Sequence, residues 1–505
     1  MRPMQPIATL LGAATPAAHH KPWPRYEIDA NTWNVVGRAL GEGGGDLLGL
    51  WANSENVYAA VRDGGFLAVV STQPKYGAFP SLGQHHPPAI RLERAIRDLY
   101  GLQPFGAPDA RPWLDHGAWG IWAPLGVKTR ASRRNPAAYD FLSVAGEGLH
   151  QIPVGPVHAG IIEPGHFRFT ANGEAVARLE ARLGYVHKGI DGLLVDADLE
   201  RAARVVARVS GDSTVAYSFA FARAVEAALE TVAPRRGQVV RGVMAELERI
   251  ANHLGDIGAI CNDASFSLIH AHCGILRERV LEICDRVFGH RLMMDRIMPG
   301  GVTHDIATDG AAMILAMLDE VGPQFDALVR LYDDTPSLQD RTCTTGIVGK
   351  DLVTRWAAGG HVGRASGRDF DSRRDLPYPP YEGVPLAIPV LQAGDVNARV
   401  WVRVREIEAS IGLLRHWLRG LPDGPVRAVI PPVEGPREGV AMTEAFRGDV
   451  LIWLRLANGR VSSGHARDAS WFQWPLLEAA IEGNIVADFP LCNKSFNCSY
   501  SGHDL

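Results

Sequence analysis

The cysteines are the residues in this 505-residue chain whose side chains could hold a soft metal, and there are six of them. No two are spaced as CxxC, so the chain cannot build a standard four-cysteine iron–sulfur or zinc site on its own. So few cysteines also exclude a disulfide framework and indicate a reducing compartment. We expect most of them to be small apolar core residues. They are Cys261, Cys273, Cys284, Cys343, Cys492 and Cys498.

A second group that could do chemistry lies in the Gly/Pro-rich segment GPVHAGIIEPGHFRF, which contains Glu163 and His166. A carboxylate and an imidazole on a constrained turn can transfer a proton. By pattern alone, structural roles are the favoured alternative. The chain has no GxGxxG after a strand and no GxxxxGK[ST], and Gly41 to Gly45 is a turn signal without a phosphate-loop context, so an autonomous nucleotide site is not supported.

Composition excludes several classes of protein. The 46% hydrophobic and 21% charged fractions are those of a globular protein, and a net charge of -5 argues against nucleic-acid binding as the main role. No uncharged apolar run reaches the ~18 residues needed to cross a bilayer, so we expect membrane contact through partners only. The stretch Pro6 to Ala18 is interpreted as a flexible tail in preference to a signal peptide.

Four segments follow from the patterning. We expect a disordered tail over residues 1–25, a small α+β domain over 26–125, a linker over 126–150 and a large mainly-α domain over 151–505. In the small domain, Phe66 to Val70 is a predicted strand and Arg91 to Leu102 a predicted helix ended by Gly101. The linker contains the basic sequence VKTRASRRNP, which is interpreted as a solvated connector, with a docking strip for an acidic partner as the alternative.

The large domain shows long helical periodicity. Apolar residues recur every three or four positions from Val239 to Cys261. Further helices are predicted at about 196–232, 268–288, 310–333 and 396–419. Strands are predicted for 426–433 and within 441–467, with Ala457-Asn458-Gly459 as a hairpin turn.

Several long motifs resemble one known family. They are GPVHAGIIEPGHFRFTANGE, RLGYVHKGID, FPSLGQHHPPAIRLERAIRDLYGLQPFGAPDARP, AELERIANHLGDIGAICND, GRASGRDFDSRRDLPY and GNIVADFPLCNKSFNCSYSGHDL. They are similar to the large subunit of formate hydrogenlyase and hydrogenase-4 type complexes, which is related to the fused C/D subunit of respiratory complex I. The resemblance implies an α+β chain in which a small α/β domain, like the C part of that fused subunit, precedes a large, mainly-α domain. This large domain would be D-like and have the fold of nickel–iron hydrogenase large subunits.

The resemblance also implies where a nickel–iron centre would be held, by thiolates in an RxCGxC and a DPCxxC motif. In this sequence the ligand positions hold Ser210, Ser213, Ser499 and Gly502, and Cys498 is one residue out of register. Hydrogenases of this class often carry a C-terminal extension, whereas this sequence stops at Leu505. We therefore expect no metal and no cofactor bound by this chain alone.

The related complex I subunit implies an alternative occupant, a quinone head group. The His position of that family holds Pro164, with His166 two residues away, and Tyr217 lies later than the family's tyrosine. The expected cavity is lined by Glu163, His166, Arg208, Ser210, Asp212, Ser213, Arg364, Asp371 and Ser499. Of these, Glu163, His166, Arg208, Asp212 and Arg364 are the candidate catalytic residues, and Ser210, Ser213 and Ser499 the candidate cofactor-binding residues. A degenerate site whose charges pair structurally is the alternative, and Glu246, Arg249 and His253 are expected to form a structural row on one helix face.

By resemblance, the chain is expected to be the peripheral-arm large subunit of a membrane-bound oxidoreductase on the cytoplasmic face of the cell membrane. It would pass electrons from an iron–sulfur partner, with quinone as the candidate acceptor, and couple this to ion translocation. The implied partners are a small iron–sulfur subunit, a ferredoxin-like subunit and antiporter-like membrane subunits. A non-catalytic scaffold is the second hypothesis, and a true hydrogenase the third and least favoured.

Overall fold

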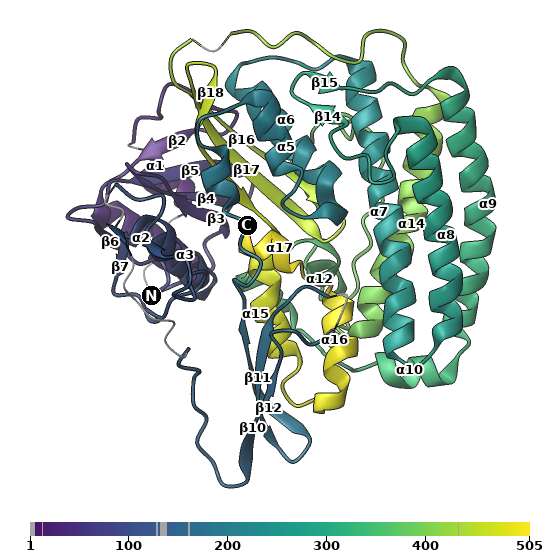
Figure 1. Ribbon diagram of the computed structural model, residues 1–505, viewed down its shortest axis with the longest axis horizontal. Coiled ribbons are helices and arrows are strands. Elements are labelled where there is room, and N and C mark those ends of the chain that lie inside the picture. The colour runs from purple at the N-terminus through teal and green to yellow at the C-terminus, as the bar shows by residue number, and fades with distance from the viewer. Residues whose placement is uncertain (1–5, 13, 128–129, 132–138, 160–161, 433) are drawn as a thin grey trace.

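The computed structural model describes residues 6–12, 14–127, 130–131, 139–159, 162–432 and 434–505. It is an α+β protein, as expected, with a small domain at the left of Figure 1 and a helix-rich body at the right. The small domain contains a four-stranded sheet in the order β2-β5-β4-β3, flanked by α2 and α3. The bounds are β2 Arg25–Glu27, α2 Ala30–Gly41, β3 Asp46–Ala52, β4 Val57–Asp63, β5 Phe66–Thr72 and α3 Ile90–Tyr100.

The predicted helix and strand of the small domain are confirmed. Helix α3 ends at Gly101, whose φ of 72° is the left-handed conformation that favours glycine at a helix end. The N–H of Gly101 donates to the carbonyl of Arg97 and so satisfies one carbonyl of the last turn. Strand β5 pairs with β4 in antiparallel register, with Asp63 opposite Phe66 across the Gly64-Gly65 turn.

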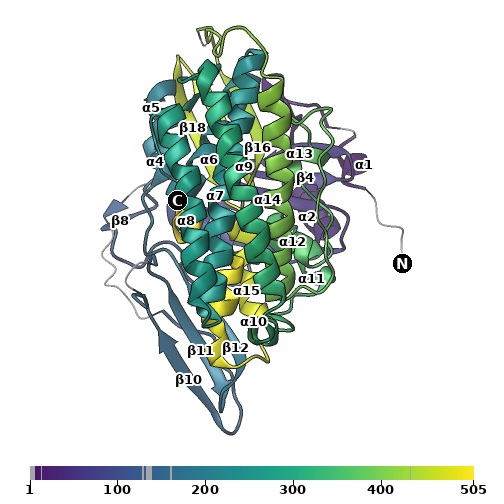
Figure 2. The same ribbon diagram turned by 90° about the vertical axis from the view of Figure 1, so that its right-hand side faces the viewer.

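Four long helices form one wall of the body, and Figure 2 shows them face on. Their apolar faces pack into one core that includes Val243, Leu254, Leu318 and Leu414. These helices match four of the five predicted ones to within a few residues. They are α7 Arg235–Asp263, α8 Ser267–Phe288, α9 Thr308–Asp333 and α14 Val396–Arg419. The helix predicted for about 196–232 is divided into α5 Leu199–Val206 and α6 Thr214–Ala228.

A five-stranded sheet in the order β1-β16-β17-β18-β13 lies between the small domain and the four helices. The predicted turn at Ala457-Asn458-Gly459 is confirmed, because Ala457 pairs with Arg460 across it. The strand predicted for 426–433 is wrong for residues 426–432, which carry no strand. The next strand along the chain begins at Arg437. The bounds are β1 His20–Lys21, β13 Ala197–Asp198, β16 Arg437–Ala445, β17 Gly448–Ala457 and β18 Arg460–Arg467.

The two sheets share an apolar interface. Trp51 and Tyr58 of the small domain pack against Trp453 of the body, with ring centroids 5.7 and 4.8 Å from the Trp453 ring. This buried aromatic surface holds the two domains together through area removed from water.

The expectation of a disordered tail over residues 1–25 is wrong for 6–12 and 14–25. Helix α1, Ile7–Leu11, buries Ile7 and Leu11 in the core of the small domain, and β1 pairs in parallel with β16 of the body. Two apolar side chains and one strand pair are enough to order a segment whose Pro/Ala/His composition is typical of a tail.

Of the predicted linker, residues 128–129 and 132–138 lie outside the described residues. After it, β10, β11 and β12 form a three-stranded sheet that projects from the body at the bottom of Figure 1. Their bounds are Leu149–Val154, His166–Asn172 and Ala175–Arg182. None of the described helices is both long and apolar enough to span a bilayer.

Short elements complete the body and carry the residues of interest. They are α4 Ile190–Leu194, α5 Leu199–Val206, the 3₁₀ turn Gly211–Ser213, α6 Thr214–Ala228, α12 Gly360–Ala365, α13 Ser372–Asp375, α15 Ser470–Ala480, α16 Phe489–Phe496 and α17 Tyr500–Asp504.

Candidate functional site

The positions that correspond to metal ligands in the resembling family lie together in the body. The Oγ atoms of Ser210 and Ser499 are 3.0 Å apart, although 289 residues separate them in the sequence. Ser210 precedes the 3₁₀ turn before α6, and Ser499 caps α17 by accepting a hydrogen bond of 2.8 Å from the N–H of Gly502. All three hydroxyls, including that of Ser213, are buried and hydrogen-bonded.

A guanidinium group occupies the neighbourhood of these hydroxyls. Arg447, in the turn between β16 and β17, forms two hydrogen bonds of 2.9 and 2.5 Å with the Asp212 carboxylate and a third of 3.3 Å with the Ser213 hydroxyl. Burial opposes ionisation of Asp212, but the Arg447 charge outweighs it and lowers the pKa of Asp212 to about 2. Ser210 also donates to this carboxylate at 2.7 Å.

The fourth ligand position, Gly502, leaves no room for a side chain. A Cβ atom on Gly502 would lie 2.6 Å from the Oδ2 atom of Asp468. Asp468 is held in place, because it accepts hydrogen bonds from the Tyr217 hydroxyl at 2.5 Å and from the N–H of Ser470 at 2.8 Å. Tyr217 thus lies at this site, but its hydroxyl is used in the hydrogen bond to Asp468.

These residues do not fit a nickel–iron centre. That centre needs four thiolates, whereas three of the positions hold hydroxyls that already make hydrogen bonds and the fourth holds a glycine. Burial raises the pKa of the nearby Cys492 to about 11 and that of Cys498 further, so neither thiol is poised to be a thiolate. Among the described residues, no group of three or more His, Cys, Asp or Glu could hold a metal ion.

Glu163 and His166 lie at one side of the cluster. The Glu163 carboxylate accepts a hydrogen bond of 3.0 Å from the N–H of Ser501, two residues beyond Ser499. His166, at the start of β11, makes contacts of 3.3 Å with the carbonyl of Gly155 and with the Nε atom of Arg168. Burial lowers the pKa of His166. Glu163 therefore contacts the cluster through the backbone N–H of Ser501. No hydrogen bond among the described residues connects His166 to the cluster.

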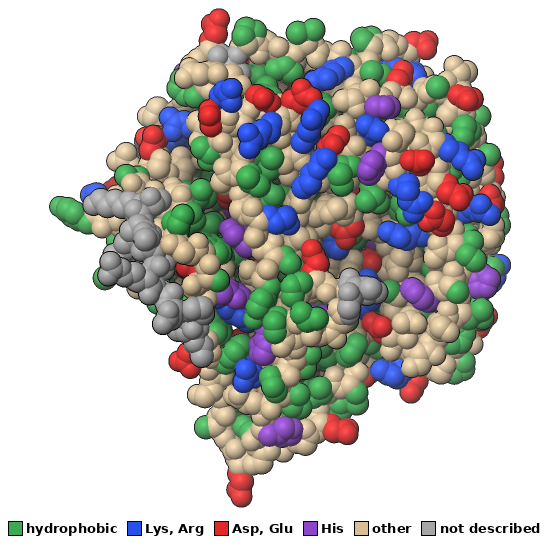
Figure 3. Space-filling view, in the orientation of Figure 1, with side chains coloured by type: hydrophobic (Ala, Val, Ile, Leu, Met, Phe, Trp, Pro, Cys, Tyr) green, Lys and Arg blue, Asp and Glu red, His purple; other side chains and the backbone are tan. Residues whose placement is uncertain are grey.

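Arg208 does not face the cluster. Its guanidinium forms an ion pair with Asp295, with an Nη2–Oδ2 distance of 2.7 Å, on a face where several other arginines gather. Figure 3 shows Lys and Arg side chains on this face, mixed with acidic ones. The expectation that Arg208 lines the cavity is therefore corrected: the 3₁₀-like turn after α5 directs Ser210 inward and leaves Arg208 at the surface.

Arg364 and Asp371 belong to a separate, fully buried ionic network. The Nη1 atom of Arg364 lies 3.1 Å from Asp371 and 3.0 Å from Glu444, and Nη2 contacts Glu406. The expected row on α7 is present only in part, since Arg249 pairs with Glu246 at 3.2 Å but His253 binds Glu406 at 2.6 Å. The members are Glu246, Arg249, His253, Arg364, Asp371, Arg373, Glu406 and Glu444.

The network holds more carboxyl groups than guanidinium groups. Four carboxyls face three arginines, so one carboxyl is left without a full positive partner. Burial, together with the neighbouring Asp371, raises the pKa of Glu444 to about 7. Burial also opposes ionisation of Asp371, but the positive charge of Arg373 outweighs it and lowers the pKa of Asp371 to about 2. Glu444 and Asp371 interact strongly, so the pair together is where the network can hold a proton near neutral pH.

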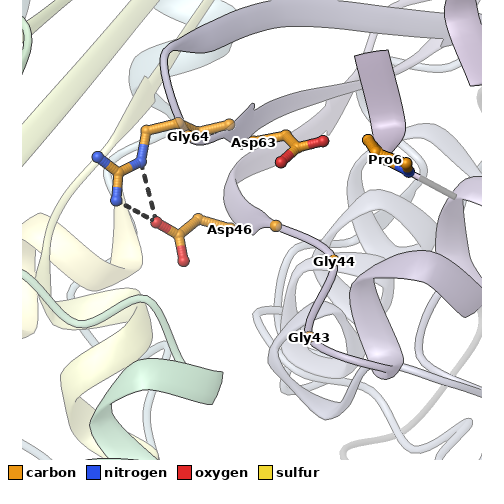
Figure 4. Close-up of a pocket in the computed structure, with 8 residues that line it drawn as sticks. Pro6, Gly43, Gly44, Asp46, Asp63 and Gly64 are labelled. Carbon is orange, nitrogen blue, oxygen red and sulfur yellow. Dashed lines mark hydrogen bonds and ion pairs between the residues drawn. The ribbon is translucent and has the colours of Figure 1, made fainter. Parts of the chain in front are cut away.

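The Gly-rich turn near residue 43 lines a separate cavity of about 260 Å³ in the small domain, shown in Figure 4. Two carboxylates, Asp46 and Asp63, line it, and Arg62 is already paired with Asp46 at 2.7 Å. Such a lining repels phosphate and agrees with the interpretation of this segment as a turn.

Four residues of these clusters, Arg447, Asp468, Glu406 and Glu444, are not predicted by the sequence motifs. Arg447 and Asp468 come from either end of the β17–β18 hairpin, far from both serine motifs in the sequence. The one signal in the sequence is the charged pair Arg467-Asp468, which lies at the end of β18.

Comparison with known proteins supports the resemblance. Residues 266–438 match the family described as "Respiratory-chain NADH dehydrogenase, 49 Kd subunit". The chain is 30% identical to hydrogenase-4 component G of Escherichia coli (strain K12) over 84% of its length and 76% of the relative's. It is 29% identical to formate hydrogenlyase subunit 5 of the same organism, over 86% of this chain and 78% of that one. It is also 29% identical to the membrane-bound hydrogenase subunit alpha of Pyrococcus furiosus, over 69% and 85%.

The chain belongs to the family of large subunits of formate hydrogenlyase and hydrogenase-4 type complexes, relatives of the D-type subunit of complex I.

Proposed function

We propose that this chain is the large peripheral-arm subunit of a membrane-bound, complex I-like oxidoreductase that works without a nickel–iron centre. An iron–sulfur subunit and a ferredoxin-like subunit would bring electrons to it, quinone is the candidate acceptor, and antiporter-like membrane subunits would translocate the ion. It would lie peripherally on the cytoplasmic face of the membrane.

The observation that supports this proposal is an ion pair beside the positions that correspond to the family's metal ligands. Asp212 and Arg447 form a two-point ion pair beside Ser210 and Ser213, where apolar residues of similar volume would be at least as stable. A carboxylate whose pKa is shifted by a specific charge partner marks a candidate functional site.

A specific observation favours the alternative, a non-catalytic scaffold. The Ser210 and Ser499 hydroxyls form a hydrogen bond with each other, and the Arg447 guanidinium donates to the Asp212 carboxylate. A fully satisfied cluster of this kind can stabilise the fold without binding any ligand.

The assembled complex separates the two. Reduced iron–sulfur clusters are followed by electron paramagnetic resonance after addition of decylubiquinone, in the wild type and in Asp212→Asn. The proposal predicts reoxidation in the wild type and at least tenfold slower reoxidation in Asp212→Asn. The matched control is Asp326→Asn on the exposed face of α9, which should behave as the wild type. No response to decylubiquinone in any of the three proteins contradicts the proposal and favours the scaffold.

A further inference from the structure

Two adjoining cavities lie where the small domain meets the body, and neither is lined by a residue of the serine cluster. One has a volume of about 630 Å³ and includes Glu55, Tyr100 and Arg455 in its lining. The other has a volume of about 360 Å³ and includes Trp119, Ile121 and Lys188. Pro124, Leu125, Asp191 and Gly192 line both cavities, so the two share a wall. Their sizes are those of small-molecule sites.

A buried carboxylate in this shared wall lacks part of its hydrogen bonding. Asp191, on α4, is 6% exposed, and its Oδ2 atom lies 2.9 Å from Nδ1 of His465 on β18. Its Oδ1 atom has no hydrogen-bond partner among the described residues, and neither does Nε2 of His465. A buried carboxylate oxygen left unpaired costs about 1–3 kcal/mol, so a donor from a bound molecule or water is expected there.

The pair is held rigidly. The His465 ring stacks on Trp51 of the small domain, with centroids 5.5 Å apart and planes 10° from parallel. The Trp119 ring in the second cavity likewise stacks on the His187 ring, with centroids 4.8 Å apart. Both walls are therefore preorganised, and binding would cost little ordering of side chains.

The two cavities differ in character. The larger one offers the Tyr100 phenol and the Glu55–Arg455 ion pair, whose closest atoms are 2.7 Å apart. Burial, and then the charge of Asp191, hold the pKa of Tyr100 well above its usual range, so the phenol stays neutral. The smaller one is lined mainly by apolar side chains, among them Trp119 and Ile121. Positive groups (Lys188, Arg455) and negative ones (Glu55, Asp191) face the space together, so neither a cation nor an anion is favoured.

We propose that these cavities bind an uncharged amphiphile whose hydroxyl group donates a hydrogen bond to Asp191 and whose apolar part packs against Trp119, Ile121 and Leu125. This site is distinct from the serine cluster, and its occupation does not depend on the redox role proposed above.

The test uses two matched probes, 4-hexylphenol and its methyl ether 4-hexylanisole, which have the same apolar part but differ in the hydroxyl donor. Isothermal titration of the purified full chain should show the phenol binding at least tenfold more tightly than the ether. Asp191→Asn should abolish this preference, because one of its two oxygens becomes an NH₂ group. Asp196→Asn, an exposed acid five residues along, is the control and should keep it.

A second variant leaves the charge unchanged. Gly192 lines both cavities, and a Cβ atom there would meet only Leu125, at 3.2 Å. The leucine side chain of Gly192→Leu should therefore occupy space where the two cavities meet and weaken binding of both probes at least tenfold. Equal binding of the two probes to the wild type, no binding of either, or binding that survives Gly192→Leu overturns the proposal and leaves water as the partner of Asp191.

Discussion

The Arg447 guanidinium lies against the Asp212 carboxylate through two hydrogen bonds of 2.9 and 2.5 Å, beside the serine hydroxyls at the family's metal position. The positive partner of Asp212 is thus the Arg447 side chain, and the neighbouring ligand positions carry no thiolate. This relationship explains how an acidic group remains ionised at a site that does not fit a metal.

Removal of Arg447 should destabilise the protein. Arg447→Met leaves Asp212 without its cationic partner, and because 37% of the Asp212 side chain is exposed we expect a loss of only about 2 kcal/mol in the free energy of unfolding. Urea unfolding measures it. The second substitution Asp212→Asn should recover part of the loss, whereas Arg405→Met, at an exposed pair with Glu408, should change stability by less than about 0.5 kcal/mol. An Arg447→Met variant as stable as the wild type contradicts the assigned pair.

The close approach of Asp468 to Gly502 predicts that even a methyl group is not tolerated there. Gly502→Ala should lose about 2 kcal/mol, because the new Cβ would lie 2.6 Å from the carboxylate oxygen. Gly412→Ala on the exposed face of α14 is the control, since nothing lies within 4 Å of its Cβ position and alanine favours a helix. If both substitutions stabilise the protein equally in urea unfolding, the Asp468 contact is wrong.

Glu248 predicts a pH dependence of stability. It accepts hydrogen bonds from the N–H groups of Val215 and Ala216 at the start of α6, and burial raises its pKa to about 8. The folded chain therefore holds a proton that the unfolded chain releases near pH 4.5, so this group's contribution to stability falls as the pH rises through 8. We expect about 2 kcal/mol of the loss between pH 6 and pH 8 to come from Glu248.

Urea unfolding of Glu248→Gln at pH 6 and pH 8 tests this sign. The variant should lose less stability over that interval than the wild type. Glu174→Gln, an exposed acid in the β11–β12 turn, should follow the wild type. An equal loss in Glu248→Gln and in the wild type would show that Glu248 is ionised in the folded protein.

Local pattern predicts much of the fold. The periodicity from Val239 to Cys261 predicts α7, and Asn458-Gly459 predicts the hairpin, because these signals are carried by neighbouring residues. The prediction of a disordered tail is wrong for residues 6–12 and 14–25, because the burial of Ile7 and Leu11 depends on a core built by residues later in the chain.

The site shows the same limit. The sequence motifs predict that Ser210 and Ser499 correspond to ligand positions, and their hydroxyls are 3.0 Å apart. Arg447 and Asp468 could not be predicted, since they reach the serines only through the register of β16, β17 and β18. The motif places Arg208 at the cavity, but a motif does not fix the direction in which a side chain points.

The nickel content of the purified, assembled complex tests the central claim most directly. Since Ser210, Ser213, Ser499 and Gly502 provide no thiolate and Asp468 fills the space beside Gly502, inductively coupled plasma mass spectrometry should find less than about 0.05 nickel per chain. Nickel close to one per chain, retained after dialysis against a chelator, would contradict the account.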